Sequence, residues 1–249
     1  MTSKSEQNFV SNSDNISGGS IFIGGVENFS LVDFPGKIAA VLFLKGCPWR
    51  CHFCYNTHLQ KMDGRSDFDW ENVKNFLKKR KGMLDAVVFS GGEPLMQKGI
   101  NRAVKEVKDM GYIAAIHTCG CYPEKLKEVL PDIGWVGLDI KAPFKKEHYK
   151  KAVGGVDSLE EVSQSLDIII KSGIEFETRT TCDPRILSVE DIYEIAEFLK
   201  SKGVKNYNLQ RYRQVPRDNT PDMECDKFFN DVKLEKFLKD NFDNVELRK

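Results

Sequence analysis

The chain has 249 residues, and its 37 basic and 37 acidic side chains give a formal net charge of zero. This balance argues against general binding to the phosphate backbone of nucleic acids, which needs an excess of basic residues. No run of residues approaches the ~18 apolar residues that a membrane-spanning helix requires, so we expect neither a nucleic acid nor a membrane as partner.

The first 20 residues are rich in Ser, Asn and Gly, and they contain too few large apolar side chains to offset the entropy of ordering. We therefore expect residues 1–20 to form a disordered N-terminal tail and residues 21–249 to form a single domain. The tail has no apolar stretch of signal-peptide length, which predicts a cytoplasmic protein. Seven cysteines in such a chain favour metal binding or redox chemistry over a disulfide framework.

From residue 21 onward, short apolar runs alternate with amphipathic stretches of about helical length. The runs predict strands at 38–44, 86–90, 112–117, 135–140, 175–181 and 204–210. Apolar residues at helical spacing predict helices around 100–107, 159–169 and 189–199, with a further helix around 228–238. Two of these helices open with capping-box patterns, Ser158-x-x-Glu161 and Ser188-x-x-Asp191.

Alternation of strands and helices predicts an α/β fold with parallel strands joined by right-handed crossovers. Six units are too few for a closed eight-unit barrel, which leaves an open doubly wound sheet or a partial barrel. In either architecture, functional groups lie on the loops that leave the C-terminal ends of the strands.

Three cysteines lie within eight residues on such a loop, directly after the first predicted strand: Cys47, Cys51 and Cys54. A structural zinc site takes four ligands, usually as two separated pairs, and Cys119 and Cys121 could supply part of a second pair. A cubane iron–sulfur cluster fits three clustered thiolates better, because it leaves one iron open to an exogenous ligand.

The run Cys47-Pro-Trp-Arg-Cys51-His-Phe-Cys54 resembles the signature of the radical S-adenosylmethionine (SAM) superfamily. Further matching segments are 29–36, 89–94, 138–143 and 179–181, so that the resemblance runs from about Gly25 to Gln210. Within the superfamily, these segments are most similar to the activating enzymes of glycyl-radical proteins, in particular those of anaerobic ribonucleoside-triphosphate reductase. The resemblance implies a partial (β/α)6 barrel of the radical SAM type.

The resemblance also implies a 4Fe–4S cluster on Cys47, Cys51 and Cys54, with SAM bound at the open iron. In the family, the Gly-Gly-Glu loop binds the amino group of SAM, and a lysine at the position of Lys141 meets its carboxylate. The SAM-binding residues that the resemblance implies are Phe53, Tyr55, Ser90, Gly91, Gly92, Glu93, Thr118, Asp139, Lys141 and Arg179. Taken alone, Asp139 and Lys141 also fit a structural ion pair, and Arg179 also fits a strand-end surface arginine.

Two positions depart from the family pattern. The stretch His117-Thr118-Cys119-Gly120 stands where relatives read Asp-Thr-Asn-Gly, which leaves open whether a monovalent cation site exists. Tyr55-Asn56-Thr57 stands where relatives commonly read His-Asn-Pro. The four remaining cysteines are dispersed and are expected to be reduced, unligated thiols: Cys119, Cys121, Cys182 and Cys225.

The activity implied by the resemblance is reductive cleavage of SAM to methionine and a 5′-deoxyadenosyl radical, which takes a hydrogen atom from a glycine of a partner enzyme. The implied partners are a glycyl-radical enzyme, first of all anaerobic ribonucleotide reductase, and a one-electron donor such as flavodoxin or ferredoxin. Two alternatives remain: a radical SAM enzyme acting on a small molecule, such as a deazapurine-forming synthase, and a non-catalytic zinc or iron–sulfur binding module. The arginine-rich stretch 210–217 predicts either a docking site for the partner's glycine loop or a solvated loop.

Overall fold

The computed structural model describes residues 20–215 and 218–249, so the expected tail lies outside the described residues apart from Ser20, as does the end of the arginine-rich stretch. The described residues form one eight-stranded sheet whose strands follow one another in chain order. The strands are β1 (Ile23–Ser30), β2 (Ala39–Leu44), β3 (Ala86–Gly91), β4 (Ile113–Thr118), β5 (Trp135–Asp139), β6 (Glu175–Cys182), β7 (Tyr207–Arg211) and β8 (Leu247–Arg248).

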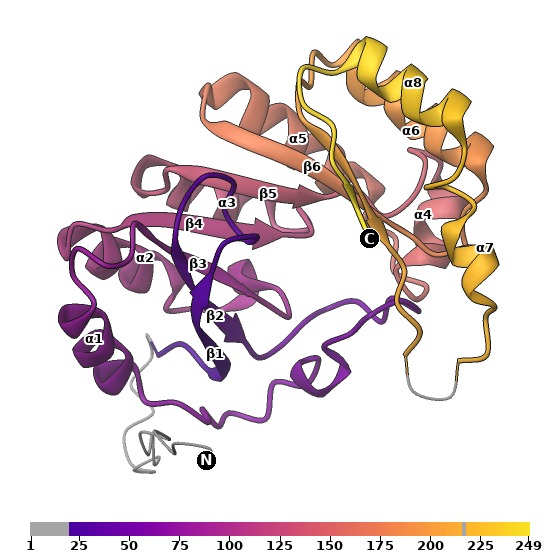
Figure 1. Ribbon diagram of the computed structural model, residues 1–249. Helices are drawn as coiled ribbons and strands as arrows, with labels where there is room; N and C mark the ends of the chain where they lie inside the picture. The colour runs from indigo at the N-terminus through magenta and orange to yellow at the C-terminus, as the bar shows by residue number, and fades with distance from the viewer. Residues whose placement is uncertain (1–19, 216–217) are drawn as a thin grey trace, which may run out of the picture.

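Strands β2 to β8 are parallel, and β1 is antiparallel to β2. In the described residues, no pairing joins β1 to β8, so the curved sheet is a partial barrel with an open side (Figure 1). Its strand order has no reversal, which is the arrangement of a barrel and not of a doubly wound sheet.

Helices connect the parallel strands and cover the outer face of the sheet (Figure 1). They are α1 (Trp70–Lys79), α2 (Ile100–Asp109), α3 (Pro123–Val129), α4 (Lys146–Ala152), α5 (Leu159–Ser172), α6 (Val189–Ser201), α7 (Asp222–Asp226) and α8 (Val232–Asn241), with short 3-10 turns at Thr57–Leu59, Pro94–Met96 and Leu130–Asp132. None of the helices in the described part of the chain combines the length and the apolar character needed to cross a membrane.

The alternation of side chains along the strands divides the core into two parts. Ala40 and Leu42 of β2 belong to the large cluster that includes the helices. Ala39 and Val41 face the other way, into a smaller cluster. Phe34, from the β1–β2 loop, stacks there on Trp135 of β5 with ring centroids 5.0 Å apart. This loop therefore fills part of the barrel interior and leaves the rest open.

All six predicted strands are confirmed, as are the helices predicted near α2, α5, α6 and α8. The capping box at Ser188 is present, with reciprocal hydrogen bonds to Asp191. The one predicted at Ser158 is wrong, because Ser158 has φ −146° and ψ 17° and its side chain accepts no capping hydrogen bond. An N-cap side chain reaches the free N–H groups of a helix from an extended backbone, which Ser158 lacks.

Candidate functional site

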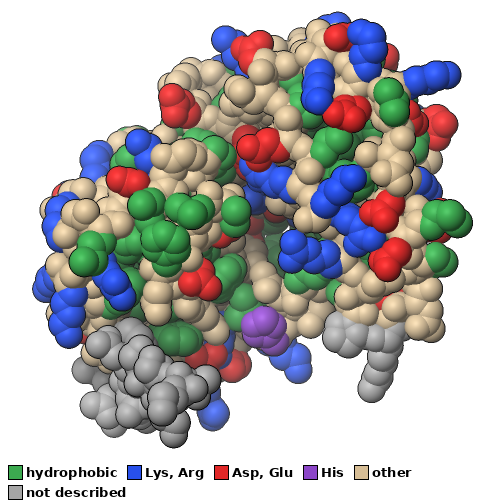
Figure 2. Space-filling model, viewed as in Figure 1, with side chains coloured by type: hydrophobic (Ala, Val, Ile, Leu, Met, Phe, Trp, Pro, Cys, Tyr) green, Lys and Arg blue, Asp and Glu red, His purple; other side chains and the backbone are tan. Residues whose placement is uncertain are grey.

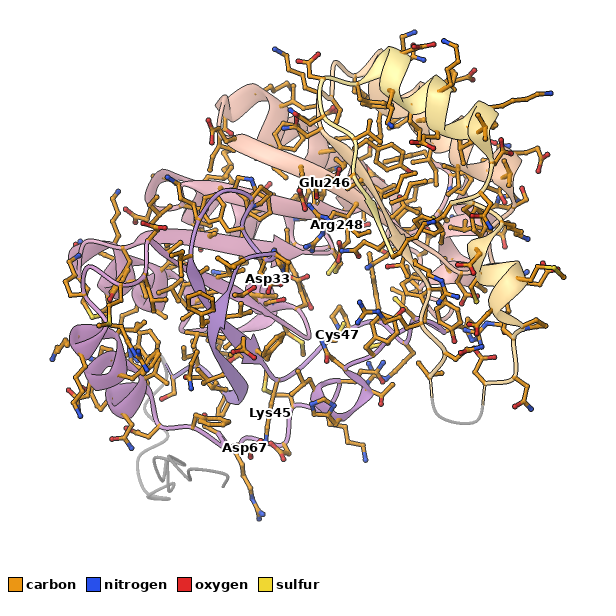
Figure 3. All side chains as sticks on the ribbon, in the orientation of Figure 1. Asp33, Lys45, Cys47, Asp67, Glu246 and Arg248 are labelled. Atoms are coloured by element: carbon orange, nitrogen blue, oxygen red, sulfur yellow. The ribbon has the colours of Figure 1, made fainter. Side chains whose placement is uncertain are left out.

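A cavity of about 980 Å³ opens at the C-terminal ends of the parallel strands. Its lining includes every predicted site residue except Glu93, so residues from five separate segments of the chain meet in one place. Figure 3 shows three of the contributing segments around the opening, marked by Asp33 before β2, Cys47 after β2 and Arg248 in β8. The sequence expectation that functional groups gather at this end of the strands is therefore confirmed.

The loop after β2 presents three cysteines to the cavity. Its start is fixed by backbone hydrogen bonds, with Gly46 N donating to Leu59 O at 2.7 Å and Cys47 N donating to Gln60 O at 3.1 Å. Inside the loop, Trp49 is buried and packs edge-on against Tyr149 of α4, with ring centroids 6.1 Å apart. These contacts anchor the loop between the cysteines, so the three thiols are held as a group.

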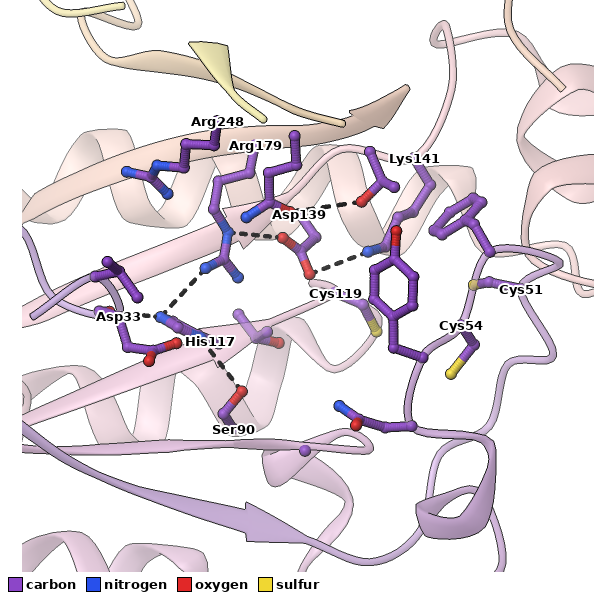
Figure 4. Close-up of a pocket in the computed structure, with 18 of the residues that line it drawn as sticks. Asp33, Cys51, Cys54, Ser90, His117, Cys119, Asp139, Lys141, Arg179 and Arg248 are labelled. Carbon is purple, nitrogen blue, oxygen red and sulfur yellow. Dashed lines mark hydrogen bonds and ion pairs between the residues drawn. The ribbon is translucent and has the colours of Figure 1, made fainter. Parts of the chain in front are cut away.

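The thiols of this loop are partly exposed toward the cavity, and Figure 4 shows Cys51 and Cys54 beside it. Burial raises the pKa of Cys47 to about 12 and that of Cys51 to about 11. Both thiols therefore need a bound cation to become thiolates near neutral pH. Three thiols on one loop, facing a cavity with room for a further ligand, fit an iron–sulfur cluster with one open iron.

Two aromatic residues of the same loop have different surroundings. Phe53 is buried, and the Lys141 ammonium lies 5.2 Å from its ring centroid. Tyr55 is 48% exposed, and its hydroxyl accepts a hydrogen bond from the backbone N–H of Arg213. Its ring stacks at 6.4 Å on Tyr212. Tyr55 thereby connects the cysteine loop to the segment that follows β7.

The Gly-Gly-Glu loop after β3 approaches β2 too closely for larger side chains. A Cβ on Gly91, whose φ is +111°, would lie 2.3 Å from the backbone nitrogen of Leu44. A Cβ on Gly92 would lie 2.2 Å from the carbonyl oxygen of Gly46. The backbone of this loop is thus exposed to the cavity directly beside the start of the cysteine loop, where a ligand can approach it closely.

Glu93 lies behind this loop and has no exposed surface. Its Oε1 accepts hydrogen bonds from Leu95 N at 3.0 Å and from Thr118 Oγ1 at 2.8 Å. Its Oε2 accepts one from Cys119 N at 2.8 Å. Burial raises the pKa of this carboxyl group. Glu93 thus connects the loop after β3 to the loop after β4, and the Thr118 hydroxyl takes part in the same network.

Three charged side chains line the other side of the cavity (Figure 4). Asp139, at the end of β5, forms ion pairs with Lys141 (Nζ to Oδ2, 3.0 Å) and Arg179 (Nε to Oδ1, 2.9 Å). Burial acts to raise the pKa of Asp139, but the two cations outweigh it and hold that pKa well below its usual range. Asp139 is therefore a carboxylate, and the two cations leave a net positive charge facing the cavity.

His117, in place of the family's aspartate, is buried beside this group. Its Nε2 lies 2.8 Å from the Asp33 carbonyl oxygen and 3.2 Å from Arg179 Nη1, and its Nδ1 lies 3.2 Å from Ser90 Oγ. Burial, together with the Arg179 charge, lowers the pKa of His117 to about 3. The ring is therefore neutral and carries a single proton. On Nε2, this proton would be donated to the Asp33 carbonyl; on Nδ1, it would leave Nε2 to accept from Arg179.

Sequence reasoning missed several cavity residues, which include Leu31, Val32 and Asp33 in the β1–β2 loop and Arg248 and Lys249 at the end of the chain. Arg211 and Arg213, from the arginine-rich stretch 210–217, line the cavity as well. Figure 2 shows the hollow between a side where hydrophobic side chains gather and a side where Lys and Arg gather. A possible sequence signal was the Leu-Val pair shortly before a Pro-Gly turn, where an exposed loop is expected. Exposed apolar residues often mark interaction sites.

The end of the chain is held at the cavity by a buried ion pair. Arg248 donates to both carboxylate oxygens of Glu177, each at 2.8 Å, and also pairs with Glu246 at 2.7 Å. The adjacent Lys249 lines the cavity, as does Arg213, and neither makes an ion pair with any residue that the structure describes. These two cations are free to meet a charged ligand.

The remaining cysteines are not all dispersed in space. Cys182 and Cys225 are buried in the protein. By contrast, Cys119 Sγ and Cys121 Sγ lie 3.3 Å apart, and Cys119 lines the cavity. The sequence suggested these two cysteines as part of a zinc-ligand pair, but it did not indicate that Glu93 would lie beside them.

Comparison with known proteins gives matches over most of the chain. The family model of the radical SAM superfamily matches residues 41–199. A protein of Methanocaldococcus jannaschii, whose name places it among the glycyl-radical enzyme activating enzymes, is 31% identical over 238 residues, or 91% of this chain and 95% of that protein. The 7-carboxy-7-deazaguanine synthase of the same organism is 28% identical over 241 residues, which are 86% of this chain and 93% of that enzyme.

Other similarities are more restricted. The pyruvate formate-lyase-activating enzyme of Listeria monocytogenes is 31% identical over 140 residues, which are 51% of this chain and 56% of that enzyme. The solved structure of anSMEcpe with bound AdoMet and a Kp18Cys peptide has a TM-score of 0.61 at 17% identity and covers 81% of this chain and 60% of that one. At this identity, the structural likeness supports the partial-barrel fold.

Proposed function

Because the chain belongs to the radical SAM superfamily, whose enzymes use a 4Fe–4S cluster and SAM, we propose that it generates a glycyl radical on a partner enzyme. The observation that carries this proposal is the 31% identity to a relative named for glycyl-radical enzyme activation, over nearly the whole of both chains. We further propose that the partner is anaerobic ribonucleotide reductase and that the electron comes from a flavodoxin or a ferredoxin.

The cysteine loop is the proposed binding site of the iron–sulfur cluster. Cys47, Cys51 and Cys54 would each bind one iron, and their loop is anchored by the buried Trp49. When bound, the cluster supplies the electron that cleaves SAM into methionine and a 5′-deoxyadenosyl radical.

SAM would lie between the cysteine loop and the charged group on β5 and β6. The backbone carbonyls at Gly91 and Gly92, which line the cavity, would accept hydrogen bonds from its ammonium group. Lys141, only 12% exposed in its side chain and already paired with Asp139, would meet its carboxylate. Phe53, Tyr55 and Ser90 would complete the pocket, while Glu93, Thr118, Asp139 and Arg179 hold these groups in position.

The rim of the cavity supports a protein as substrate. Leu31 and Val32 line the opening and are 61% and 73% exposed, an unusual position for large apolar side chains. Arg213 and Lys249 line it as well. A rim with apolar side chains and unpaired cations suits a chain segment that carries apolar and acidic residues better than a small solute.

A second candidate is a radical SAM enzyme that acts on a small molecule, and a specific observation favours it. A deazaguanine synthase is 28% identical over 86% of this chain. The cavity, at about 980 Å³, lies near the upper end of the roughly 300–1,000 Å³ typical of small-molecule sites. In this case Arg213 and Lys249 would bind an anionic group of the substrate.

Electron paramagnetic resonance (EPR) distinguishes the two candidates. The reconstituted and reduced protein is incubated anaerobically with SAM and the anaerobic ribonucleotide reductase of the same organism. We expect a glycyl-radical doublet that is absent when the radical-site glycine of the reductase is replaced by alanine. SAM cleavage without a doublet on this or any other glycyl-radical enzyme of the organism, together with turnover of a purine precursor, would contradict the proposal and favour the second candidate.

A further inference from the structure

Two cysteines and a buried carboxylate form a compact group at the wall of the cavity, apart from the three cysteines of the β2 loop. The potential ligand atoms of Glu93, Cys119 and Cys121 all lie within 4.8 Å of one another. We propose that these three residues bind a thiophilic divalent metal ion of the zinc type, in addition to the iron–sulfur cluster. This proposal does not depend on the proposed function.

The distances suit such an ion with little rearrangement. Zinc binds thiolates at ~2.3 Å and carboxylate oxygens at ~2.0–2.2 Å, which in a tetrahedral site places two thiolate sulfurs roughly 3.8 Å apart. The two sulfurs here lie 3.3 Å apart, so a few tenths of an ångström of separation would admit the metal. Two thiolates and one carboxylate are also a ligand set that zinc accepts, whereas calcium and magnesium prefer oxygen ligands alone.

The turn that brings the two thiols together is fixed by the surrounding protein. Gly120, between them, has φ +76°, a left-handed conformation that favours glycine. A Cβ at this position would also lie 3.0 Å from Leu138 Cδ1. Ser165 Oγ donates to the Gly120 carbonyl at 2.7 Å, and Gly120 N donates to Thr118 Oγ1 at 3.0 Å. The two sulfurs are therefore held on one side of a rigid turn and do not meet by chance on a flexible loop.

Glu93 is held in the same way and lacks a counter-charge. It has no exposed surface, and no ion pair joins it to a cation among the residues that the structure describes. Its partners are two backbone N–H groups, the Thr118 hydroxyl and the Cys119 thiol. The thiol proton in the last contact is one that a metal ion would replace, which would leave a carboxylate oxygen of Glu93 for the metal. A buried carboxylate without a cation is costly, and a bound metal ion would supply the missing charge.

Binding is a proton exchange with no change in oxidation state. The metal ion takes the place of the Sγ protons of Cys119 and Cys121, which pass to solvent, and Glu93 binds as a carboxylate. Three protein ligands leave a fourth position open, as in catalytic zinc sites, and the exposure of Cys119 to the cavity allows water to fill it.

Cobalt(II) is a suitable probe, because it replaces zinc and absorbs visible light when tetrahedral. The holoenzyme is first reconstituted anaerobically so that the loop cysteines are occupied by iron, and it is then titrated with Co²⁺. We expect one Co²⁺ per chain, with d–d bands and a thiolate-to-cobalt charge-transfer band in the difference spectrum. Elemental analysis after gel filtration should show that one Zn²⁺ displaces it while the iron content is unchanged.

Three variants test the ligands. Cys121→Ser and Cys119→Ser should each weaken Co²⁺ binding by at least about 10-fold and remove part of the charge-transfer band, since even residues that only orient a metal ligand contribute ~10–100-fold. Cys182→Ser is the matched control, because Cys182 is an equally buried thiol elsewhere in the core, and it should bind Co²⁺ like the wild type. Absence of a tightly bound Co²⁺, or binding that is unchanged in both Cys119→Ser and Cys121→Ser, would overturn the proposal. Circular dichroism of each variant shows whether it is folded.

Discussion

The two halves of the sheet supply different chemistry to the same cavity. The half from β1 to β4 contributes thiols, closely packed glycines and exposed apolar side chains, such as Cys51, Gly91 and Val32. The half from β5 to β8 contributes charge, with Asp139 and Arg179 placed side by side by the register of β5 and β6. The first half holds the three loop cysteines that we propose as cluster ligands, and the second half holds the charged side chains that we propose to bind SAM beside it.

The two halves also build their groups in different ways. The three loop cysteines come from eight consecutive residues, so local spacing defines them. The charged group draws on β5 and β6, with Arg248 of β8 paired to Glu177 of β6, so the fold has to form before its members meet. If this division is functional, substitutions of the loop cysteines should remove the cluster, and substitutions in the charged group should weaken SAM binding while the cluster stays intact.

The largest effect is expected for Cys51→Ala. Loss of one of three thiolate ligands should lower the iron content and reduce SAM cleavage by at least about 100-fold, because residues that merely orient a metal ligand already contribute ~10–100-fold. The readout is iron and sulfide content together with 5′-deoxyadenosine formed under reducing conditions. Cys182→Ala, which removes a buried thiol of β6 outside the loop, should retain both. SAM cleavage at the wild-type rate in Cys51→Ala would contradict the assignment of the cluster to the loop cysteines.

An intermediate effect is expected for Lys141→Met. The substitution keeps the volume of the side chain but removes the charge that faces the cavity and pairs with Asp139. Removing one member of a buried charged pair costs about 2 kcal/mol or more, which corresponds to roughly 30-fold weaker SAM binding. The measurement is the KM for SAM at unchanged iron content. Lys145→Met, which breaks an exposed pair with Glu194, is the control and should be neutral. Loss of iron in Lys141→Met would contradict the division between the halves.

A smaller effect is expected for Val32→Asp. If the apolar rim docks a partner protein, the charge should lower the rate of partner activation by about 10-fold, since a central interface residue contributes more than ~1 kcal/mol. SAM cleavage in the absence of a partner should not change. Val232→Asp places the same charge at an equally exposed valine, 76% against 73% exposed, at the start of α8. Equal rates of partner activation in Val32→Asp and Val232→Asp would show that the apolar rim does not dock the partner.

The smallest effect is expected for Arg213→Ala. A cation at the edge of an interface mainly affects the rate of association, so we expect a decrease of about 2- to 5-fold at low ionic strength that disappears as salt is added. The readout is partner activation measured over a range of salt concentrations. Lys205→Ala, which removes an exposed cation elsewhere, should show no salt-dependent difference. A defect in Arg213→Ala that persists at high salt would indicate a direct contact with substrate.

Features with a local signature could be predicted from the sequence. The strands β2 to β5 are largely apolar runs, the cysteine loop has a characteristic spacing, and the Gly-Gly-Glu loop follows a strand. These features depend on neighbours in the chain. The residues at 90–92, 139 and 179 then meet in the cavity because parallel strands end at the same edge of the sheet.

The parts that escaped prediction depend on distant neighbours. β1 contains two glycines and several polar residues, and it is a strand because it pairs with the edge of β2. β8 has only two residues, and Arg248 reaches the cavity through its pair with Glu177. The contact of Cys119 with Cys121 depends on the left-handed turn at Gly120. None of these has a pattern of its own in the sequence.

The most direct test is the EPR spectrum of the reduced cluster, recorded with and without SAM in the wild type, Cys51→Ala and Lys141→Met. We expect a 4Fe–4S signal in the wild type that shifts when SAM is added. In Cys51→Ala we expect no such signal. In Lys141→Met we expect a signal like that of the wild type, which does not shift at the same SAM concentration. A full SAM-induced shift in Lys141→Met would contradict the role of Lys141 in SAM binding. An intact cluster signal in Cys51→Ala would contradict the assignment of the cluster to the loop cysteines.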